Sequence, residues 1–531
     1  MKVFLALLAL SFVTAGILIG QANSANWPTY GGDAQRSGWE KTDTRITKPN
    51  AKDLQLLFKL KLESQAKGSR QLMPPVILGR LISYRGFKEL AFVGTNSDIV
   101  YAIDADLGKI FWQKHLEYAS IDPQATGSSA ACPGGMTAIP TMPAPGVTAR
   151  GGRGAAPAAA GAGAGARGAA NAFVGGTTSV YAISSDGRLH RLNTSTGDDM
   201  AQPVSVLPAN ARISTLNMAN NVIYAVTSQS CNGAPNALWA IDLNGDAPKA
   251  TSFALNAGGD LGLGGATLGS DGTVYVHTGV VLTDGSQKWA PTLQALDPLG
   301  LQPGMSFSTR YIFDNFSFDP YVNVTSPAIF NYKNRDLIAG STWDDRLYLL
   351  DSTSKEMRDP LYRTPPLGAN ARAGSGGRGI WGGLSTWQDS DGTRWVLAPI
   401  WGPLHPDLKI PGASPTPNGA IVAFKLEESQ GKTVLTPAWV SRDMSSPMPP
   451  VITNGVVFVL SAGEFGIDER PKGSTHAALY ALDAATGKEL YSSRNLITSP
   501  ASLTGITLAN GRVYFGTTDS TFYAFGIYQE R

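Results

Sequence analysis

The sequence lacks a strong charge of either sign. Its 43 Lys and Arg residues nearly balance 41 Asp and Glu residues, which leaves a formal net charge of +2. A chain so close to neutral offers no electrostatic basis for binding nucleic acid or an acidic surface. It also has no run of basic residues interleaved with aromatic ones, so we expect no nucleic-acid partner.

Histidine and cysteine are scarce as well. The five histidines are scattered without the spacing of metal ligands, which gives no indication of a zinc or copper site. The two cysteines, Cys132 and Cys231, are not adjacent, and no CxxCH motif is present to attach a haem. In an oxidising compartment such a pair is a candidate for a disulfide.

Long apolar runs are confined to the N-terminus. Lys2 precedes an apolar stretch at 3–20, and small and polar residues follow at 21–25. This pattern predicts an export signal over residues 1–25, with an uncleaved membrane anchor as the alternative. No Cys follows the stretch, which argues against a lipoprotein anchor. We therefore expect a periplasmic or secreted protein with no membrane span in the mature chain.

What the sequence does contain is a repeat with the pattern aromatic-Ala-aliphatic-Asp. Successive copies start between 43 (480 to 523) and 80 (101 to 181) residues apart, and their letters degenerate progressively. The eight copies are Tyr101-Ala-Ile-Asp104, Tyr181-Ala-Ile-Ser184, Trp239-Ala-Ile-Asp242, Gln294-Ala-Leu-Asp297, Tyr348-Leu-Leu-Asp351, Val422-Ala-Phe-Lys425, Tyr480-Ala-Leu-Asp483 and Tyr523-Ala-Phe-Gly526. Repeats of this length with several short strands each are typical of propeller blades.

Each copy is expected to form the third strand of a blade and the turn that follows it. An upstream run rich in β-branched and aromatic residues would supply the second strand, as in "ELAFVGTNSDIVYAID" (89–104) and "NAFVGGTTSVYAIS" (171–184). A glycine turn and a fourth strand with an aromatic end follow, as in "DADLGKIFW" (104–112). The aromatic residue would pack between neighbouring blades.

The predicted fold is therefore all-β: an eight-bladed β-propeller of four-stranded antiparallel sheets over residues 26–531. The last blade is one strand short, and "LQLLFKLKL" (54–62) is expected to complete it and close the ring. The Gly/Ala-rich segment 150–170 is expected to be a disordered insertion in the second blade. The Pro-rich segment 402–419 is expected to connect the second and third strands of blade six.

The predicted fold assigns each cysteine to a connection between strands. Cys132 would precede the inner strand of blade two, and Cys231 would lie between the second and third strands of blade three. In a propeller, both kinds of connection emerge on one face, which we call the looped face. We expect a Cys132–Cys231 disulfide on the looped face.

The N-terminal stretch "NWPTYGGDAQRSGW" (26–39), followed by "NAKDLQLLFKL" (50–60), resembles the N-terminus of mature quinoproteins. These are alcohol and methanol dehydrogenases that carry pyrroloquinoline quinone (PQQ) on an eight-bladed propeller. The A-x-D-x-x-x-G-K-x-x-W pattern at 102–112 is similar to that family's tryptophan-docking repeat. The resemblance covers roughly residues 26–531 and implies the same fold.

The resemblance also implies a site on the looped face. In that family Ca²⁺ holds the quinone through a Glu and an Asn, and an Asp beside the metal acts as base. The stretch "DNFSFDPYVNVTSPAIF" (314–330) resembles the segment with this Asp and matches it to Asp319. A carboxylate there would accept a proton from an alcohol as hydride leaves.

Elsewhere the sequence departs from the family's pattern. Val280 stands where the Asn ligand would be, and the stretch 228–236, where the Glu would fall, has no carboxylate. Trp343 replaces the expected basic residue near the quinone carbonyls, with Arg346 displaced along the strand. In that family a vicinal disulfide covers one face of the quinone ring, and it has no counterpart here because the two cysteines are not adjacent. Because calcium needs several hard oxygen ligands, we expect neither PQQ nor calcium to be bound.

Two further residues could serve a ligand. Arg378 and Trp381 precede the inner strand of blade six, where a cation beside an aromatic ring at the mouth of the channel could hold a small molecule; loop packing is the alternative. The sequence thus favours an exported propeller that binds a small molecule or another protein on its looped face. A divergent quinoprotein dehydrogenase with Asp319 as base and an envelope assembly scaffold are the alternatives.

Overall fold

The computed structural model is an almost purely β structure with two short 3₁₀ turns, η1 (Ala51–Asp53) and η2 (Cys231–Gly233). The residues it describes are 26–64, 72–83, 86–116, 132, 134–143, 179–255, 264–283, 288–301, 303–308, 325–341, 345–353, 360–369, 379–463 and 475–528. The expected export signal (1–25) and the insertion 150–170 lie outside these residues. Among those described, no helix is long and apolar enough to cross a bilayer.

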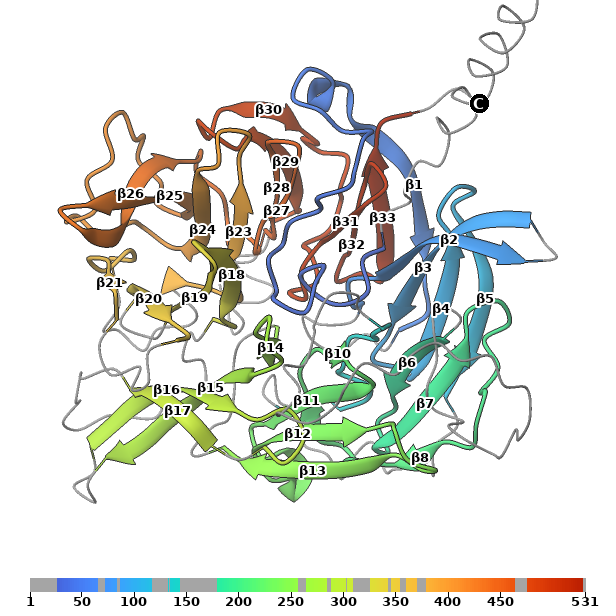
Figure 1. Cartoon of the computed structure of the whole chain (residues 1–531). Coiled ribbons are helices and arrows are strands. Elements are labelled where there is room, and N and C mark those ends of the chain that lie inside the picture. The colour runs from blue at the N-terminus through green and yellow to red at the C-terminus, as the bar shows by residue number, and fades with distance from the viewer. Residues whose placement is uncertain are drawn as a thin grey trace, which may run out of the picture.

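Eight antiparallel sheets follow one another around a ring, which confirms the predicted eight-bladed propeller (Figure 1). Blade one comprises β2 (Val76–Ser83), β3 (Gly86–Gly94), β4 (Ile99–Asp104) and β5 (Lys109–His115), and blade two comprises β6 (Ser179–Ile183), β7 (Arg188–Asn193) and β8 (Val204–Ser205). Blade three comprises β9 (Arg212–Ile213), β10 (Asn217–Ala219), β11 (Val222–Ser228), β12 (Ala237–Asp242) and β13 (Lys249–Ala254). Blade four comprises β14 (Thr267–Leu268), β15 (Val274–Thr283), β16 (Lys288–Leu296) and β17 (Pro303–Ser308). Blade five comprises β18 (Ala328–Tyr332), β19 (Arg335–Ser341), β20 (Leu347–Asp351) and β21 (Tyr362–Arg363). Blade six comprises β22 (Gly379–Ile380), β23 (Ser385–Gln388), β24 (Arg394–Trp401), β25 (Gly419–Ser429) and β26 (Lys432–Val440). Blade seven comprises β27 (Val451–Thr453), β28 (Val456–Ser461), β29 (Ala478–Asp483) and β30 (Glu489–Ser492), and blade eight comprises β31 (Thr507–Ala509), β32 (Arg512–Gly516), β33 (Thr521–Gly526) and β1 (Gln55–Lys61).

The ring is closed by its N-terminal strand, as predicted. β1 pairs antiparallel with β33, from Gln55 opposite Gly526 to Lys61 opposite Thr521, and becomes the outermost strand of blade eight. This pairing removes the free edge that the C-terminal sheet would otherwise present. The Pro-rich segment 402–419 joins β24 to β25, also as predicted.

In blade two the predicted strand assignment is wrong. Tyr181-Ala-Ile-Ser184 lies at β6, which is the second strand, because Tyr181 pairs with Thr141 of the inner segment and β6 then pairs with β7. The third strand is β7, and its turn has the sequence Asn193-Thr-Ser-Thr-Gly197. The Asn193 side chain accepts the N–H of Ser195, just as Asp483 accepts the N–H of Ala485 in blade seven. The motif thus predicted the wrong third strand for blade two, whereas the Asx turn identifies that strand correctly.

Aromatic side chains dock one blade on the next. Trp112 of blade one donates its indole N–H to the Thr194 carbonyl in blade two (2.9 Å), and its ring covers Gly197. In the same way, Trp439 of blade six donates its indole N–H to the Ala484 carbonyl of blade seven (3.0 Å), and its ring covers Gly487. A Cβ at Gly197 or Gly487 would lie within 2.7 Å of the ring, so glycine is required there.

The segment before β1 runs along the inside of the ring (Figure 1) and contacts the inner strands in chain order. Backbone hydrogen bonds from residues 27–38 reach Ile77, Met142, Leu268, Ile329, Thr386 and Ile452 of blades one, two, four, five, six and seven. The Thr29 hydroxyl bonds the Leu216 carbonyl of blade three, and Asp43 accepts the N–H of Gly511 in blade eight. One short segment therefore touches all eight blades and fills the channel.

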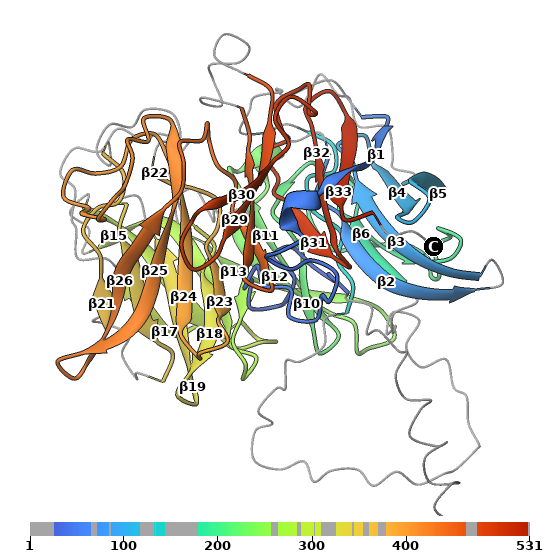
Figure 2. The same ribbon diagram turned by 90° about the horizontal axis from the view of Figure 1, so that it is seen from above.

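The turns opposite the looped face are mostly tight. Asn454-Gly455 and Asn510-Gly511 adopt positive φ at both positions, as two-residue hairpins of this kind require. Two hairpins on this side are longer: in blade one, β2 and β3 stay paired as far as Ser83 and Gly86 and extend away from the ring (Figure 2), and in blade six β25 and β26 stay paired as far as Ser429 and Lys432. We call this side of the molecule the turn face.

Candidate functional site

The looped face is where the resemblance places a site. Three of its candidate residues, Asp319, Trp343 and Arg378, lie outside the residues that the structure describes. Arg346 and Trp381 are described, and so is the Cys132–Cys231 pair.

Trp381 follows β22 and is buried, with 7% of its surface exposed. Its ring stacks on that of Trp401 from β24, with centroids 4.3 Å apart and planes 14° from parallel. Trp401 in turn donates its indole N–H to the Pro447 carbonyl (2.9 Å). The packing of both indole rings fixes the connection into blade six near the channel.

Arg346 lies just before β20 and points along blade five. It donates from Nη1 to the carbonyl of Thr364 (2.7 Å), while its neighbour Asp345 accepts the N–H of Ile380 in blade six (3.0 Å). Asp345 has a positive φ of 54°, as expected of a turn former, and also links two blades. Arg346 and Trp381 thus bond to different blades.

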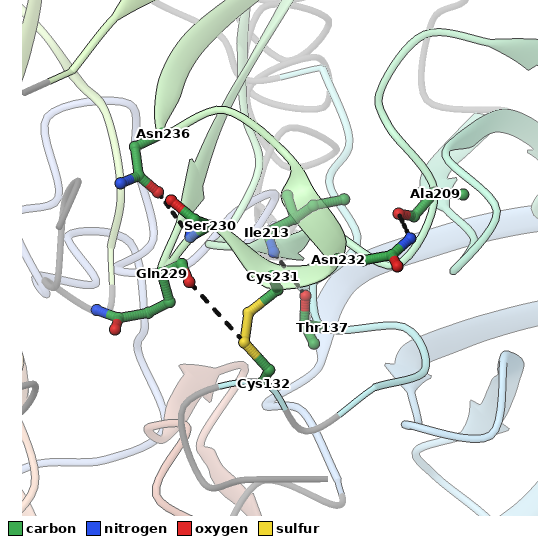
Figure 3. The surroundings of a disulfide bond; sticks show 9 residues. All are labelled: Cys132, Thr137, Ala209, Ile213, Gln229, Ser230, Cys231, Asn232 and Asn236. Carbon is green, nitrogen blue, oxygen red and sulfur yellow. Dashed lines mark hydrogen bonds between the residues drawn. A yellow bond between two sulfur atoms is a disulfide. The ribbon is translucent and has the colours of Figure 1, made fainter. Parts of the chain in front are cut away.

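The predicted disulfide is present. Cys132 and Cys231 are joined across 99 residues and link the connection into blade two with a connection of blade three (Figure 3). The joined turn takes left-handed conformations at Gln229, Ser230 and Asn232. Asn236 accepts the N–H of Ser230, and Asn232 donates to the Ala209 carbonyl. This turn is where the Glu ligand of a quinoprotein would fall, and it offers amide and hydroxyl groups only.

The second expected ligand position also lacks a carboxylate. Val280 lies within β15, opposite Pro291 of β16. Three residues earlier in the same strand, the buried His277 has its Nδ1 2.6 Å from the Thr325 carbonyl, and burial lowers its pKa to about 4. The His277 side chain is therefore a neutral imidazole that donates to a carbonyl. Within the described ranges, no three His, Cys, Asp or Glu side chains gather in a way that could hold a metal ion.

A buried arginine, which the sequence reasoning missed, forms the floor beneath this face. Arg36 donates from Nη1 to the Thr29 hydroxyl (2.7 Å) and the Tyr30 carbonyl (2.5 Å), and from Nη2 to Thr215 and Leu216 of blade three. It belongs to the segment that fills the channel, and its guanidinium lies 5.8 Å from the centre of the Tyr30 ring. The role of Arg36 is to fix this segment against blade three.

Blade two contains a Ser–His–Asp arrangement that sequence reasoning also missed. His190 places Nε2 3.2 Å from Ser184 Oγ and Nδ1 2.9 Å from Asp199 Oδ1. Both Ser184 and His190 are buried, and Ser184 Oγ also lies 2.5 Å from Asp186 Oδ1. A nucleophile in this position cannot reach a substrate, so the arrangement stabilises the blade and supports no hydrolysis.

Three solved structures share this fold over nearly the whole chain. A quinohemoprotein alcohol dehydrogenase from Pseudomonas putida aligns with 95% of this chain and 80% of its own (TM-score 0.55, 12% identity). One from Comamonas testosteroni aligns over 98% and 83% (0.54, 15%). A europium-containing methanol dehydrogenase aligns over 94% and 98% (0.58, 12%).

At these identities the likeness shows the fold, and the predicted resemblance to PQQ-repeat propellers is confirmed at that level. No protein-family model matches the sequence, and no curated protein matches it either.

Proposed function

We propose that this chain is an exported propeller that binds a small molecule or another protein on its looped face and lacks a PQQ–calcium site. The observation that carries the proposal is the chemistry of the two ligand positions. One is a disulfide-linked turn without a carboxylate, and the other is Val280 inside a strand. A divalent or trivalent cation favours several carboxylate and carbonyl oxygens, which these positions do not supply.

Export is supported by the covalent chemistry. Disulfides persist in oxidising compartments and are rare in the cytosol, and the chain's only two cysteines form one. The predicted signal at residues 1–25 points the same way. A periplasmic or secreted location is the proposal that fits both.

The rival function is a divergent dehydrogenase with Asp319 as base. It is favoured by the fold shared with three dehydrogenases over at least 94% of this chain. One of these proteins is described as containing europium, so a lanthanide must be tested beside calcium. Fold alone does not transfer an activity, because one fold hosts many chemistries.

PQQ titration separates the two functions. Mature protein is mixed with PQQ and either Ca²⁺ or Eu³⁺, and quinone absorbance and dye-linked oxidation of methanol, ethanol and glucose are followed. We expect neither saturable uptake nor turnover. Turnover that is lost in Asp319→Ala and kept in the matched Asp314→Ala would establish the rival function and overturn the proposal.

Binding on the looped face is tested by photo-crosslinking in whole cells. A crosslinker at position 343, which is predicted to lie on this face, is the probe, and one at the exposed Leu299, in a turn of blade four on the turn face, is the control. We expect an adduct at 343 whose purified partner binds the protein, with affinity lowered about tenfold by Trp343→Ala and unchanged by Leu299→Ser. Equal adducts at both positions, or equal affinities, would contradict looped-face binding.

A further inference from the structure

The first and last blades meet at a seam, and a cavity of about 540 Å³ opens there on the turn face. Its walls come from the β2–β3 hairpin, the turn after β4, the strand β1, the segment after β33 and the segment that precedes η1. A cavity of this size lies in the range that holds small molecules. It is on the opposite side of the ring from the looped face.

The rim of this seam cavity is apolar and exposed. Phe87, Leu107 and Tyr528 expose 68%, 60% and 67% of their surface, which makes them three of the seven large apolar residues that are exposed among the described residues. They come from three separate segments and surround one opening. Exposed apolar groups that converge on a concavity mark a binding site more often than scattered ones do.

Two cations of the seam cavity are available to a ligand. Arg80 lies 5.2 Å from the centre of the Phe87 ring, and Arg45 donates from Nη1 to the Asn510 carbonyl (2.8 Å). Within the described part of the chain, neither guanidinium has a carboxylate within ion-pair distance. Each has donors left for an anion, and guanidinium binds a carboxylate, sulfonate or phosphate through paired N–H groups.

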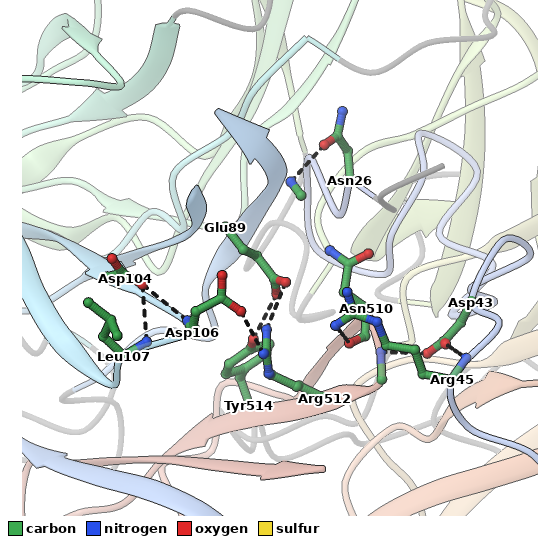
Figure 4. Close-up of polar contacts among 12 residues, drawn as sticks. Asn26, Asp43, Arg45, Glu89, Asp104, Asp106, Leu107, Asn510, Arg512 and Tyr514 are labelled. Atoms are coloured by element: carbon green, nitrogen blue, oxygen red, sulfur yellow. Dashed lines mark hydrogen bonds and ion pairs between the residues drawn. The ribbon is translucent and has the colours of Figure 1, made fainter. Parts of the chain in front are cut away.

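The floor of the cavity is an ionic network of one guanidinium and two carboxylates (Figure 4). Arg512 bonds Glu89 Oε2 (2.7 Å) and Asp106 Oδ1 (2.8 Å), and the Tyr514 hydroxyl bonds Glu89 Oε1 (2.9 Å). The two carboxylates are thus engaged by Arg512 and Tyr514. With Arg45 and Arg80 added, and with Lys88 paired to Asp104, the charged groups around the opening sum to +1, which favours a negative ligand.

We propose that the seam cavity binds a small amphipathic anion, with its acidic group on Arg45 and Arg80 and its apolar body against Phe87, Leu107 and Tyr528. The cavity is concave, which suits a single molecule in solution better than the flat surface of a bilayer. This proposal does not depend on the function proposed for the looped face, because no residue is shared.

The test uses a matched pair of fluorescent probes on the full mature protein. 8-Anilinonaphthalene-1-sulfonate carries an apolar body with one negative charge, and N-phenyl-1-naphthylamine is the same body without the charge. We expect saturable binding of the sulfonate, about tenfold weaker binding of the neutral probe, and about tenfold weaker sulfonate binding in Arg80→Gln and in Phe87→Ser.

Matched variants away from the seam are Arg494→Gln and Leu299→Ser, both exposed, and both are expected to bind the sulfonate as the unaltered protein does. Arg80 and Phe87 are on a projecting hairpin, and unchanged circular dichroism will verify folding. Absent sulfonate binding, equal binding of both probes, or full binding by Arg80→Gln would overturn the proposal. Sedimentation with phosphatidylglycerol vesicles, lost in Phe87→Ser, without soluble-probe binding would instead assign the seam to membrane lipid.

Discussion

The seam between blades eight and one differs from the interface between blades one and two. At the latter, Trp112 covers Gly197 and donates an N–H to Thr194. At the seam, Phe58 of β1 occupies the same place over Gly108 of blade one, but it is smaller, only half-buried and has no N–H to donate. Ion pairs between side chains join the two blades at the seam, and a cavity remains beside them. The docking residue therefore decides whether a blade interface is sealed or open.

The largest expected effect comes from removing the two docking rings. Trp112→Ala should lower the free energy of unfolding by about 3–5 kcal/mol, since it removes a buried indole and its hydrogen bond. Phe58→Ala should cost roughly 1.5–3 kcal/mol, because the ring is smaller and only partly buried. Urea denaturation followed by circular dichroism measures both. Equal losses would show that the two interfaces are closed equally well.

Next comes the ionic network that replaces the indole at the seam. Arg512→Met should lower the free energy of unfolding by about 3 kcal/mol at pH 7, because it leaves buried Glu89 without its cation. Burial raises the pKa of Glu89, and Arg512 opposes that rise. The loss should therefore shrink in acid, as Glu89 gains a proton.

Glu89→Gln in the Arg512→Met background should restore part of the lost stability. Exposed Glu427→Gln is the matched control and should change stability by less than about 0.5 kcal/mol. A loss of the same size at pH 4 and pH 7 would contradict the role given to the Glu89 charge.

The interface of blades one and two has its own titrating group. Asp98 of blade one accepts the N–H of Ser185 in blade two (2.6 Å), and burial raises its pKa from 3.8 to about 6, with Asp186 adding to the rise and His115 opposing it. Because the folded pKa is the higher one, its contribution to stability is complete below pH 4 and is lost as pH rises through 6.

Asp98→Asn should therefore be more stable than the unaltered protein above pH 7, by roughly 2–3 kcal/mol, and equal to it near pH 4. Parallel urea titrations at pH 4, 5, 6 and 7 measure the difference, and contributions from other groups cancel between the two proteins. A constant difference across this range would show that Asp98 is not the titrating group.

The smallest effect sharpens the comparison most directly. Phe58→Trp should convert the seam to the sealed type, because the indole N–H can reach the turn carbonyls of blade one and the larger ring takes up cavity volume. We expect a gain of about 1 kcal/mol in unfolding free energy and weaker binding of the anilinonaphthalene sulfonate. A stable variant with unchanged probe binding would separate the docking residue from the cavity.

The sequence predicted the ring because its strands are local and repetitive. The order of strands, the closure by 54–62 and the Cys132–Cys231 pairing all follow from counting strands and assigning each connection to a face. The error in blade two has a physical cause: Tyr181-Ala-Ile-Ser184 has the apolar letters of any buried strand. The Asn193-x-x-x-Gly197 spacing, shared with 104–108 and 483–487, would have identified the third strand.

The seam cavity was not predictable in the same way. Arg45, Arg80, Leu107 and Tyr528 come from four segments of the chain, and none belongs to a motif. Their meeting depends on the closure of the ring and on the projection of the β2–β3 hairpin. A repeat describes what blades have in common, whereas this cavity arises from what the first and last blades do not share with the others.

The segment inside the ring also restricts how the molecule can assemble. Residues 27–61 contact the blades from the first to the last. They therefore cannot reach their final positions until the residues up to 526 have been synthesised and folded. A chain delivered across a membrane with its N-terminal end first must keep that segment unpaired for almost its entire passage. A fragment that begins after residue 61 would keep strands of all eight blades but lack the outer strand of blade eight and the segment in the centre, which would expose it to proteases and aggregation.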